Sequence, residues 1–113
     1  MGSLKKLHPE VRLSIAGKEG ESSVFGPGVA ALCLGVRTKG SLFAAAKDMS
    51  MAYSKAWRIM KSTEEALGIT LLNRDGAHGS TLTPEGIKIL DAYIEINDKL
   101  QAEADELYAK LMK

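Results

Sequence analysis

Basic and hydroxyl-bearing side chains gather on one face of a helix that the sequence predicts over residues 52–67. After Tyr53, the exposed positions on that face are Ser54, Lys55, Arg58, Lys61 and Ser62. Ammonium and guanidinium groups donate hydrogen bonds to phosphate oxygens and to acceptors on base edges, and hydroxyl groups donate or accept. The pattern therefore suits a polyanion with hydrogen-bonding groups in its grooves, such as double-stranded DNA.

The charges are distributed unevenly along the chain, although the formal net charge is only +1. Between Arg37 and Lys61 there are six cations and one acid, whereas residues 84–113 hold seven acids and four lysines. This asymmetry favours a local polyanion-binding surface with the acidic segment turned away from it. A simpler alternative stays open, in which the lysines and arginines only solvate two helices.

A shorter helix precedes the basic one. Ser41 is a good N-cap for it, and its apolar stripe has the spacing i, i+3, i+4, i+7, with Leu42, Ala45, Ala46 and Met49. The basic helix has a buried stripe of its own, formed by Ala52, Ala56, Ile59, Met60, Thr63 and Leu67. Two helices joined by a short turn, the second with a basic outer face, are what a helix-turn-helix needs to enter the DNA major groove.

Short β elements are expected on both sides of this unit. Alternating apolar residues over 11–15 predict a half-buried strand, which a second strand at 22–25 would complete as an N-terminal hairpin. Gly26-Pro27-Gly28 then opens a helix over 29–38. Residues 69–73 and 81–83 predict a second hairpin, whose glycine-containing loop places Arg74 and His78 near a DNA backbone. An ordinary hairpin without a DNA role is the alternative.

The last predicted helix begins with Thr83 as N-cap and Pro84 at its first position, and it continues to about Met112. Beyond its first turns the apolar positions narrow to a seam of Tyr93, Ile96, Leu100, Ala104, Leu107 and Leu111. A narrow seam with acidic flanks predicts a partner helix, and the same helix of a second subunit is the natural candidate. Packing of this helix on its own domain is the alternative.

Other classes of protein have little support in the residues. His8 and His78 stand alone, and Gly26-Pro27-Gly28 lacks the lysine and hydroxyl residue of a phosphate-binding loop, so no enzyme is expected. Cys33 lies on an apolar stripe and is interpreted as a small buried hydrophobe, against a catalytic or redox role. One cysteine excludes an internal disulfide, and no apolar run approaches the roughly 20 residues of a membrane span.

Several segments carry a family resemblance: GSLFAAAKDM, YSKAWRIM, EEALGITLLNR and LTPEG. Together they resemble the winged helix-turn-helix of LysR-type transcriptional regulators, and they look closest to the DNA-binding domain of the molybdate-responsive ModE family. The resemblance covers residues 11–111. It implies that the last helix pairs two subunits. Trp57 lies on the flank between the buried and exposed stripes and is interpreted as a packing anchor of the recognition helix, with a DNA contact as the alternative. Bases would be read by Tyr53, Ser54, Lys55 and Arg58, and phosphates would be contacted by Lys39, Ser41, Lys61, Arg74 and His78.

The chain departs from the family pattern in two places. Ser50 and Ala52 stand where the family has Gly and then Ser, and Ala52 cannot cap the recognition helix, a loss of roughly 1 kcal/mol. The alternative is that Ser50 caps the helix, which shifts its start. The oxyanion-binding domains of full-length molybdate regulators also do not fit in 113 residues, so molybdate binding and other cofactors are not expected.

The sequence therefore predicts a mainly α fold with a small β component (α+β). It is a winged helix-turn-helix with an N-terminal β-hairpin and a long C-terminal dimerisation helix. Residues 1–9 are a flexible lead-in, 10–83 the DNA-binding domain and 84–113 the dimerisation helix. The predicted function is a cytoplasmic, sequence-specific transcriptional regulator that binds double-stranded DNA as a homodimer. The alternative is a winged-helix module that docks proteins. Neither the operator nor a small-molecule effector follows from the residues.

Overall fold

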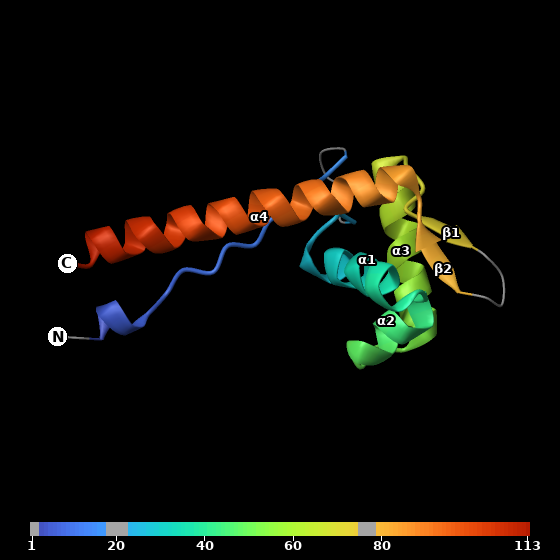
Figure 1. Ribbon diagram of the computed structural model, residues 1–113, viewed down its shortest axis with the longest axis horizontal. Helices are drawn as coiled ribbons and strands as arrows, with labels where there is room; N and C mark the ends of the chain where they lie inside the picture. Colours follow the sequence, from blue (N-terminus) through green and yellow to red (C-terminus); the bar gives the residue numbers. More distant parts are fainter. Residues whose placement is uncertain (1–2, 18–22, 75–78) are drawn as a thin grey trace.

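A helical head and one long projecting helix make up the fold (Figure 1). The computed structural model describes residues 3–17, 23–74 and 79–113. Its elements are the 3-10 helix η1 (Leu4–Lys6), α1 (Pro27–Lys39), α2 (Leu42–Asp48), α3 (Tyr53–Leu67), β1 (Leu72–Arg74), β2 (Ser80–Leu82) and α4 (Pro84–Leu111). Helices α1, α2 and α3 with the β1–β2 hairpin form the head, and α4 extends away from it. The predicted winged helix-turn-helix with a long last helix is confirmed.

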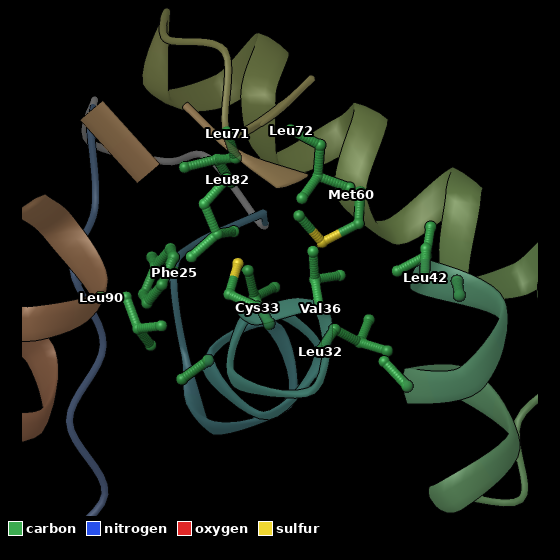
Figure 2. Packing of buried hydrophobic residues seen from close by; sticks show 14 of the residues in the cluster. Phe25, Leu32, Cys33, Val36, Leu42, Met60, Leu71, Leu72, Leu82 and Leu90 are labelled. Carbon is green, nitrogen blue, oxygen red and sulfur yellow. The ribbon is translucent and has the colours of Figure 1, made fainter. Parts of the chain in front are cut away.

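The core lies between α1, α3, the root of the hairpin and the first turns of α4 (Figure 2). Helix α1 is central, because Leu32, Cys33 and Val36 are all buried there. Met60 reaches this core from α3, and Leu90 reaches it from α4. The predicted stripes are therefore largely correct, since apolar side chains at helical spacing must share one buried face.

Helices α1 and α2 pack with almost no space between them. A Cβ atom added at Gly35 would lie 2.5 Å from Cβ of Ala45, so only glycine fits at this position of α1. Ala45 and Ala46 are buried in the contact. Met49 was expected to join the same stripe, but α2 ends at Asp48 and Met49 lies outside the helix with an exposed side chain.

The helix ends follow local chemistry. The side chain of Ser41 accepts a hydrogen bond from the Ala44 amide, and that of Thr83 accepts one from Gly86, so both predicted N-caps are confirmed. Gly68 ends α3 in the left-handed region at φ 72°, which agrees with the predicted helix end at residue 67. Ala52 precedes α3 without any side-chain cap, and Ser50 in the preceding turn has φ 53°.

The predicted N-terminal hairpin is wrong in its extent. Only one isolated antiparallel bridge, between Ile15 and Phe25, joins the two segments, and residues 18–22 lie outside the described part of the chain. The alternating side chains of residues 11–15 do have one half-buried face, but that segment packs along α4. The Tyr93 hydroxyl donates to the Leu13 carbonyl at 2.9 Å. Alternating apolar residues indicate an extended segment with one buried face, but they do not show whether that segment packs on a strand or on a helix.

The β1–β2 hairpin is the wing of the winged helix-turn-helix, and its strands begin and end at other residues than predicted. β1 begins at Leu72 instead of residue 69, and it pairs antiparallel with β2 in the register Leu72↔Leu82 and Arg74↔Ser80. Leu71 is buried before the strand starts, and its amide is bound by a side chain of α3. Burial of this apolar run therefore comes from packing against the head, with strand pairing confined to its end. Across the described residues, each helix is too short or too polar to cross a membrane.

Candidate nucleic-acid interface

The outer face of α3 presents the cations that the sequence singled out. Ser54, Lys55, Arg58 and Lys61 are all exposed, while Ala56 and Met60 on the opposite face are buried in the core. This division follows from the helical period, because positions three and four apart share a face. Within the described residues, none of the three cations has a carboxylate within ion-pair distance, whereas Arg37, Lys39 and Arg74 each have one.

An aromatic row lies along one flank of α3. The rings of Phe43 and Tyr53 meet edge to face with centroids 5.7 Å apart, and Tyr53 meets Trp57 in the same way at 6.0 Å. Arg74 from the wing continues the row, with its guanidinium carbon 4.4 Å from the centroid of the Trp57 ring. Trp57 is half-buried, which agrees with its interpretation as an anchor of the recognition helix.

A surface cleft of about 640 Å³ opens beside this row. It brings together four of the predicted DNA-contacting residues, namely Lys39, Ser41, Tyr53 and Arg74. Lys39 is paired there with Asp48, and the Ser41 oxygen already accepts the Ala44 amide. Its hydroxyl proton remains available to an acceptor. His78 belongs to the predicted set but lies outside the described residues.

Lys55 and Arg58 lie on the other flank of α3. They line a separate cleft of about 500 Å³ together with Val29 at the start of α1 and Ser62 on α3. The structure therefore does not gather the predicted residues into one pocket. Lys55 and Arg58 lie on one flank of α3, and Tyr53 lies on the other flank with Lys39, Ser41 and Arg74 of neighbouring elements. A ligand that contacts both sets must extend across the outer face of α3.

Sequence reasoning missed two residues of this region. Phe43 is 60% exposed at the start of α2 and ends the aromatic row. Its signal was a large aromatic residue outside the apolar stripe of a short helix. Glu64 was missed because an acid on a basic helix resembles a solvent-facing residue, yet its side chain is only 15% exposed and contacts the wing.

The seam of α4 is only partly available to a partner. Ile96, Leu100, Leu107 and Leu111 are exposed, and Ala104 is half-buried. Tyr93 is instead buried in the subunit's own core, where its ring lies 5.5 Å from that of Phe25 and its hydroxyl is hydrogen-bonded. The helical period alone does not separate Tyr93 from the others, because the head covers only the first turns of α4.

Cys33 has no access to solvent or substrate. Its side chain is buried, and burial raises the pKa of the thiol to about 12, with the nearby Glu64 carboxylate as a smaller cause. A thiol with such a pKa stays protonated at neutral pH and is a poor nucleophile. Its surroundings are those of a small packing residue.

The comparisons with known proteins identify the class of this interface. A family model described as "Bacterial regulatory helix-turn-helix protein, lysR family" matches residues 31–87, which hold α2, α3 and the wing. The chain belongs to this family. LysR-family proteins of this description are DNA-binding transcription regulators, so the predicted function is confirmed at that level and the protein-docking alternative is not favoured.

Two solved structures resemble this LysR-family chain. One, a crystal structure of the CbnR_DBD–DNA complex, has a TM-score of 0.62 and 27% sequence identity, covering 73% of this chain and 93% of that one. The other is a crystal structure of CbnR, a LysR family transcriptional regulator. It has a TM-score of 0.58 and 28% identity, covering 71% of this chain.

The match to CbnR extends over 27% of that regulator's length, which limits it to one part of the larger protein. The comparison with curated protein sequences gives no significant match. The matches are to LysR-family regulators, and the narrower resemblance to the ModE family finds no support among them.

Proposed function

We propose that this LysR-family chain binds double-stranded DNA as a homodimer in the cytoplasm, with α3 of each subunit in the major groove. The observation that carries the proposal is the set of cations on the outer face of α3, Lys55, Arg58 and Lys61. They have no acid partner within the described residues. Protein cations that lack internal partners are free to neutralise phosphates and to bind base edges. The DNA in the crystal of CbnR_DBD supports the same ligand for this related chain.

We assign roles by position on the head. Lys55 and Arg58, with Tyr53 and Ser54, read base edges from the first turns of α3. The phosphate contacts come from Lys61 on α3, from Lys39 at the end of α1, from Ser41 at the N-cap of α2, and from Arg74 on the wing. Before DNA binds, Lys39 is paired with Asp48, and this exposed pair is weak enough to be exchanged for phosphate. Arg74 stays beside the largely buried Glu64 and offers its remaining N–H donors to phosphate.

We propose that α4 forms the contact with the second subunit. From Ile96 onward it carries four exposed apolar side chains, Ile96, Leu100, Leu107 and Leu111, and exposed rows of this kind mark protein contacts. Pairing of two α4 helices places two recognition helices on one DNA molecule. We expect half-sites on one side of the duplex, separated by one or more helical turns of roughly 34 Å each.

The test measures binding to DNA that the protein itself selects from a random-sequence pool. We expect salt-sensitive binding that Lys55→Ala with Arg58→Ala weakens by about 2–5 kcal/mol, the sum of two lost base contacts. Fluorescence anisotropy measures the affinity, and circular dichroism checks the fold. The matched control is Lys110→Ala with Lys113→Ala, which removes the same charge from the far end of the molecule. Unchanged binding by the first variant, or equal losses in both, would contradict the assignment of α3 as the reading helix.

A further inference from the structure

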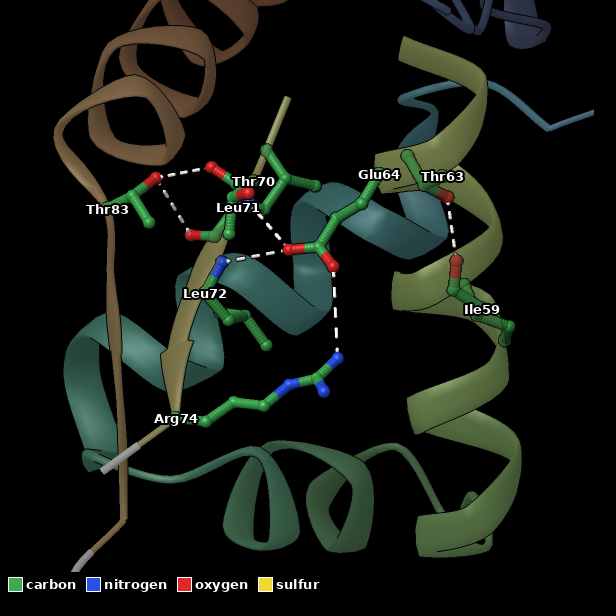
Figure 3. Close-up of polar contacts among 8 residues, drawn as sticks. All are labelled: Ile59, Thr63, Glu64, Thr70, Leu71, Leu72, Arg74 and Thr83. Carbon is green, nitrogen blue, oxygen red and sulfur yellow. Dashed lines mark hydrogen bonds and ion pairs between the residues drawn. The ribbon is translucent and has the colours of Figure 1, made fainter. Parts of the chain in front are cut away.

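Glu64 is an acid on the recognition helix that faces the wing instead of solvent (Figure 3). Its side chain is only 15% exposed, whereas the next residue, Glu65, is exposed. One carboxylate oxygen, Oε2, accepts the backbone N–H of Leu71 at 2.7 Å and that of Leu72 at 3.2 Å. A largely buried carboxylate is tolerated when charge-assisted hydrogen bonds of this kind satisfy it.

These two hydrogen bonds fix the root of the wing to α3. Leu71 is fully buried, and Leu72 is the first residue of β1. From the other side, the Thr83 amide donates to the Leu71 carbonyl at 2.9 Å, and the Thr83 hydroxyl donates to the Thr70 carbonyl at 2.6 Å. The start of β1 is therefore clamped between the recognition helix and the N-cap of α4.

The same carboxylate also approaches the wing's cation. Oε1 of Glu64 lies 4.0 Å from Nη2 of Arg74, while the Arg74 guanidinium stacks over Trp57 at 4.4 Å. Glu64 and Trp57, both on α3, thus fix the position of the Arg74 side chain on β1. The Arg74 side chain remains 53% exposed, and a guanidinium has five N–H donors, so part of it is free to bind phosphate.

We propose that Glu64 is a positioning residue for DNA binding, which holds the wing and Arg74 at a fixed place relative to the outer face of α3. This inference depends on the proposed DNA binding. For removal of the Glu64 charge, the inference predicts a change in DNA affinity that is opposite in sign to the change expected from charge repulsion alone. A carboxylate that acts only through its charge repels DNA, so its removal strengthens binding. A carboxylate that positions the wing supports binding, so its removal weakens it.

The experiment compares Glu64→Gln with Glu65→Gln in the full chain, by fluorescence anisotropy on the selected DNA. Both substitutions keep the side-chain size and remove one negative charge from α3. We expect Glu65→Gln to bind as tightly as the unmodified protein or more tightly. Glu64→Gln is expected to bind about tenfold more weakly, the effect of losing a charge-assisted hydrogen bond. Equal or tighter binding by Glu64→Gln would overturn the inference.

Three further readouts separate positioning from general stability. The slope of affinity against salt should fall by about one in Arg74→Ala and also in Glu64→Gln, because each loses the wing's phosphate contact. In the Arg74→Ala background, Glu64→Gln should cost less than it does alone. Hydrogen exchange at the Leu71 and Leu72 amides should speed up in Glu64→Gln, while exchange in α1 stays unchanged. An unchanged salt slope, or fully additive losses, would contradict the role.

A second variant keeps the inference testable if Glu64→Gln does not fold. Arg74→Lys retains the charge but loses the planar group that lies between Trp57 and Glu64. We expect it to weaken binding severalfold, and unchanged affinity would overturn the inference. The inference and the proposed function fail in different ways. Absence of any DNA binding by the unmodified protein removes both, whereas normal binding by the Glu64 and Arg74 variants removes only the positioning role.

Discussion

The turn between α2 and α3 contains two residues, Ser50 and Ala52, that are unfavourable for the local backbone structure. Ser50 adopts φ 53°, in a region that glycine enters freely and other L-residues enter at a cost of about 1 kcal/mol or more. Ala52 stands at the N-cap of α3 and offers no side-chain acceptor to the first amides of the helix. Sequence comparison with the family identified both positions, but only the backbone angles show that α3 still begins at Tyr53.

Substitution of these two residues should stabilise the protein. We expect Ser50→Gly to raise the free energy of unfolding by roughly 0.5 kcal/mol and Ala52→Ser by about 1 kcal/mol, because one relieves the left-handed backbone and the other supplies a cap. Urea unfolding measures both. The control is Ser62→Gly in the middle of α3, which should destabilise by about 0.5 kcal/mol. A loss of stability in Ser50→Gly would show that strain at this turn is negligible.

Cys33 gives the stability a dependence on alkaline pH. Its pKa is 9.0 in an ordinary setting and about 12 when folded, so above pH 9 the unfolded chain releases a proton that the folded chain keeps. Stability should therefore be complete below about pH 9 and fall as the pH rises towards 12. Urea unfolding at pH 8 and pH 10.5 should show that the free energy of unfolding falls less in Cys33→Ala than in the unmodified protein. The pKa of Tyr93 is also raised by burial, and it contributes equally in both proteins. Identical falls would contradict this assignment.

At the scale of elements, the N-terminal segment differs most from its prediction. Its alternating pattern was correct, but within the described residues it pairs with the second segment only at Ile15 and Phe25, and the rest of it packs along α4. Three residues of α4, spaced about two turns apart, bind its backbone. Tyr93 binds Leu13, Gln101 binds both Val11 and Pro9, and Tyr108 binds Leu4. Any residue offers the same backbone groups to a side chain, so these contacts leave no pattern in the sequence of the N-terminal segment. Its packing on α4 could therefore not be predicted from the sequence.

Removal of the middle contact should release the segment from α4. Gln101 accepts the Val11 amide at 2.9 Å and donates to the Pro9 carbonyl at 2.8 Å. In Gln101→Ala we expect faster hydrogen exchange at Val11, with exchange in α1 unchanged, because the head does not depend on this contact. The matched control is Gln101→Glu, which keeps an acceptor for Val11 and should retain partial protection. Unchanged exchange in Gln101→Ala would show that the segment is held by other contacts.

At the scale of the whole molecule, the long dimension comes from α4. Its 28 residues span about 42 Å, and the principal extents of the chain are 57 × 30 × 22 Å. Seven of the 14 acids of the sequence belong to this helix, most of whose length extends away from α3 (Figure 1). In the proposed dimer, such a helix would keep two heads apart, so that each head would bind one of two half-sites.

The charges on α4 predict the direction of that pairing. In an antiparallel pair centred near Ala102, Leu107 lies opposite Ile96 and Lys99 lies opposite Glu106, whereas a parallel pair sets each charge level with its own copy. We expect Lys99→Glu and Glu106→Lys each to weaken the dimer about threefold to tenfold at low salt, since two surface pairs are lost. The double variant should recover the affinity, measured by sedimentation. A double variant as weak as the single ones would contradict antiparallel pairing.

The sequence by itself determined what depends on residues close together in the chain. The caps at Ser41 and Thr83, the end of α3 at Gly68 and the buried and basic faces of α3 all follow from neighbours within a turn or two, because helix geometry brings those residues together. Only the tertiary structure decided contacts between distant segments. Glu64 bound to the root of the wing, Tyr93 turned into the core and the N-terminal segment docked on α4 depend on how the elements pack. Residue types at a fixed spacing do not specify that arrangement.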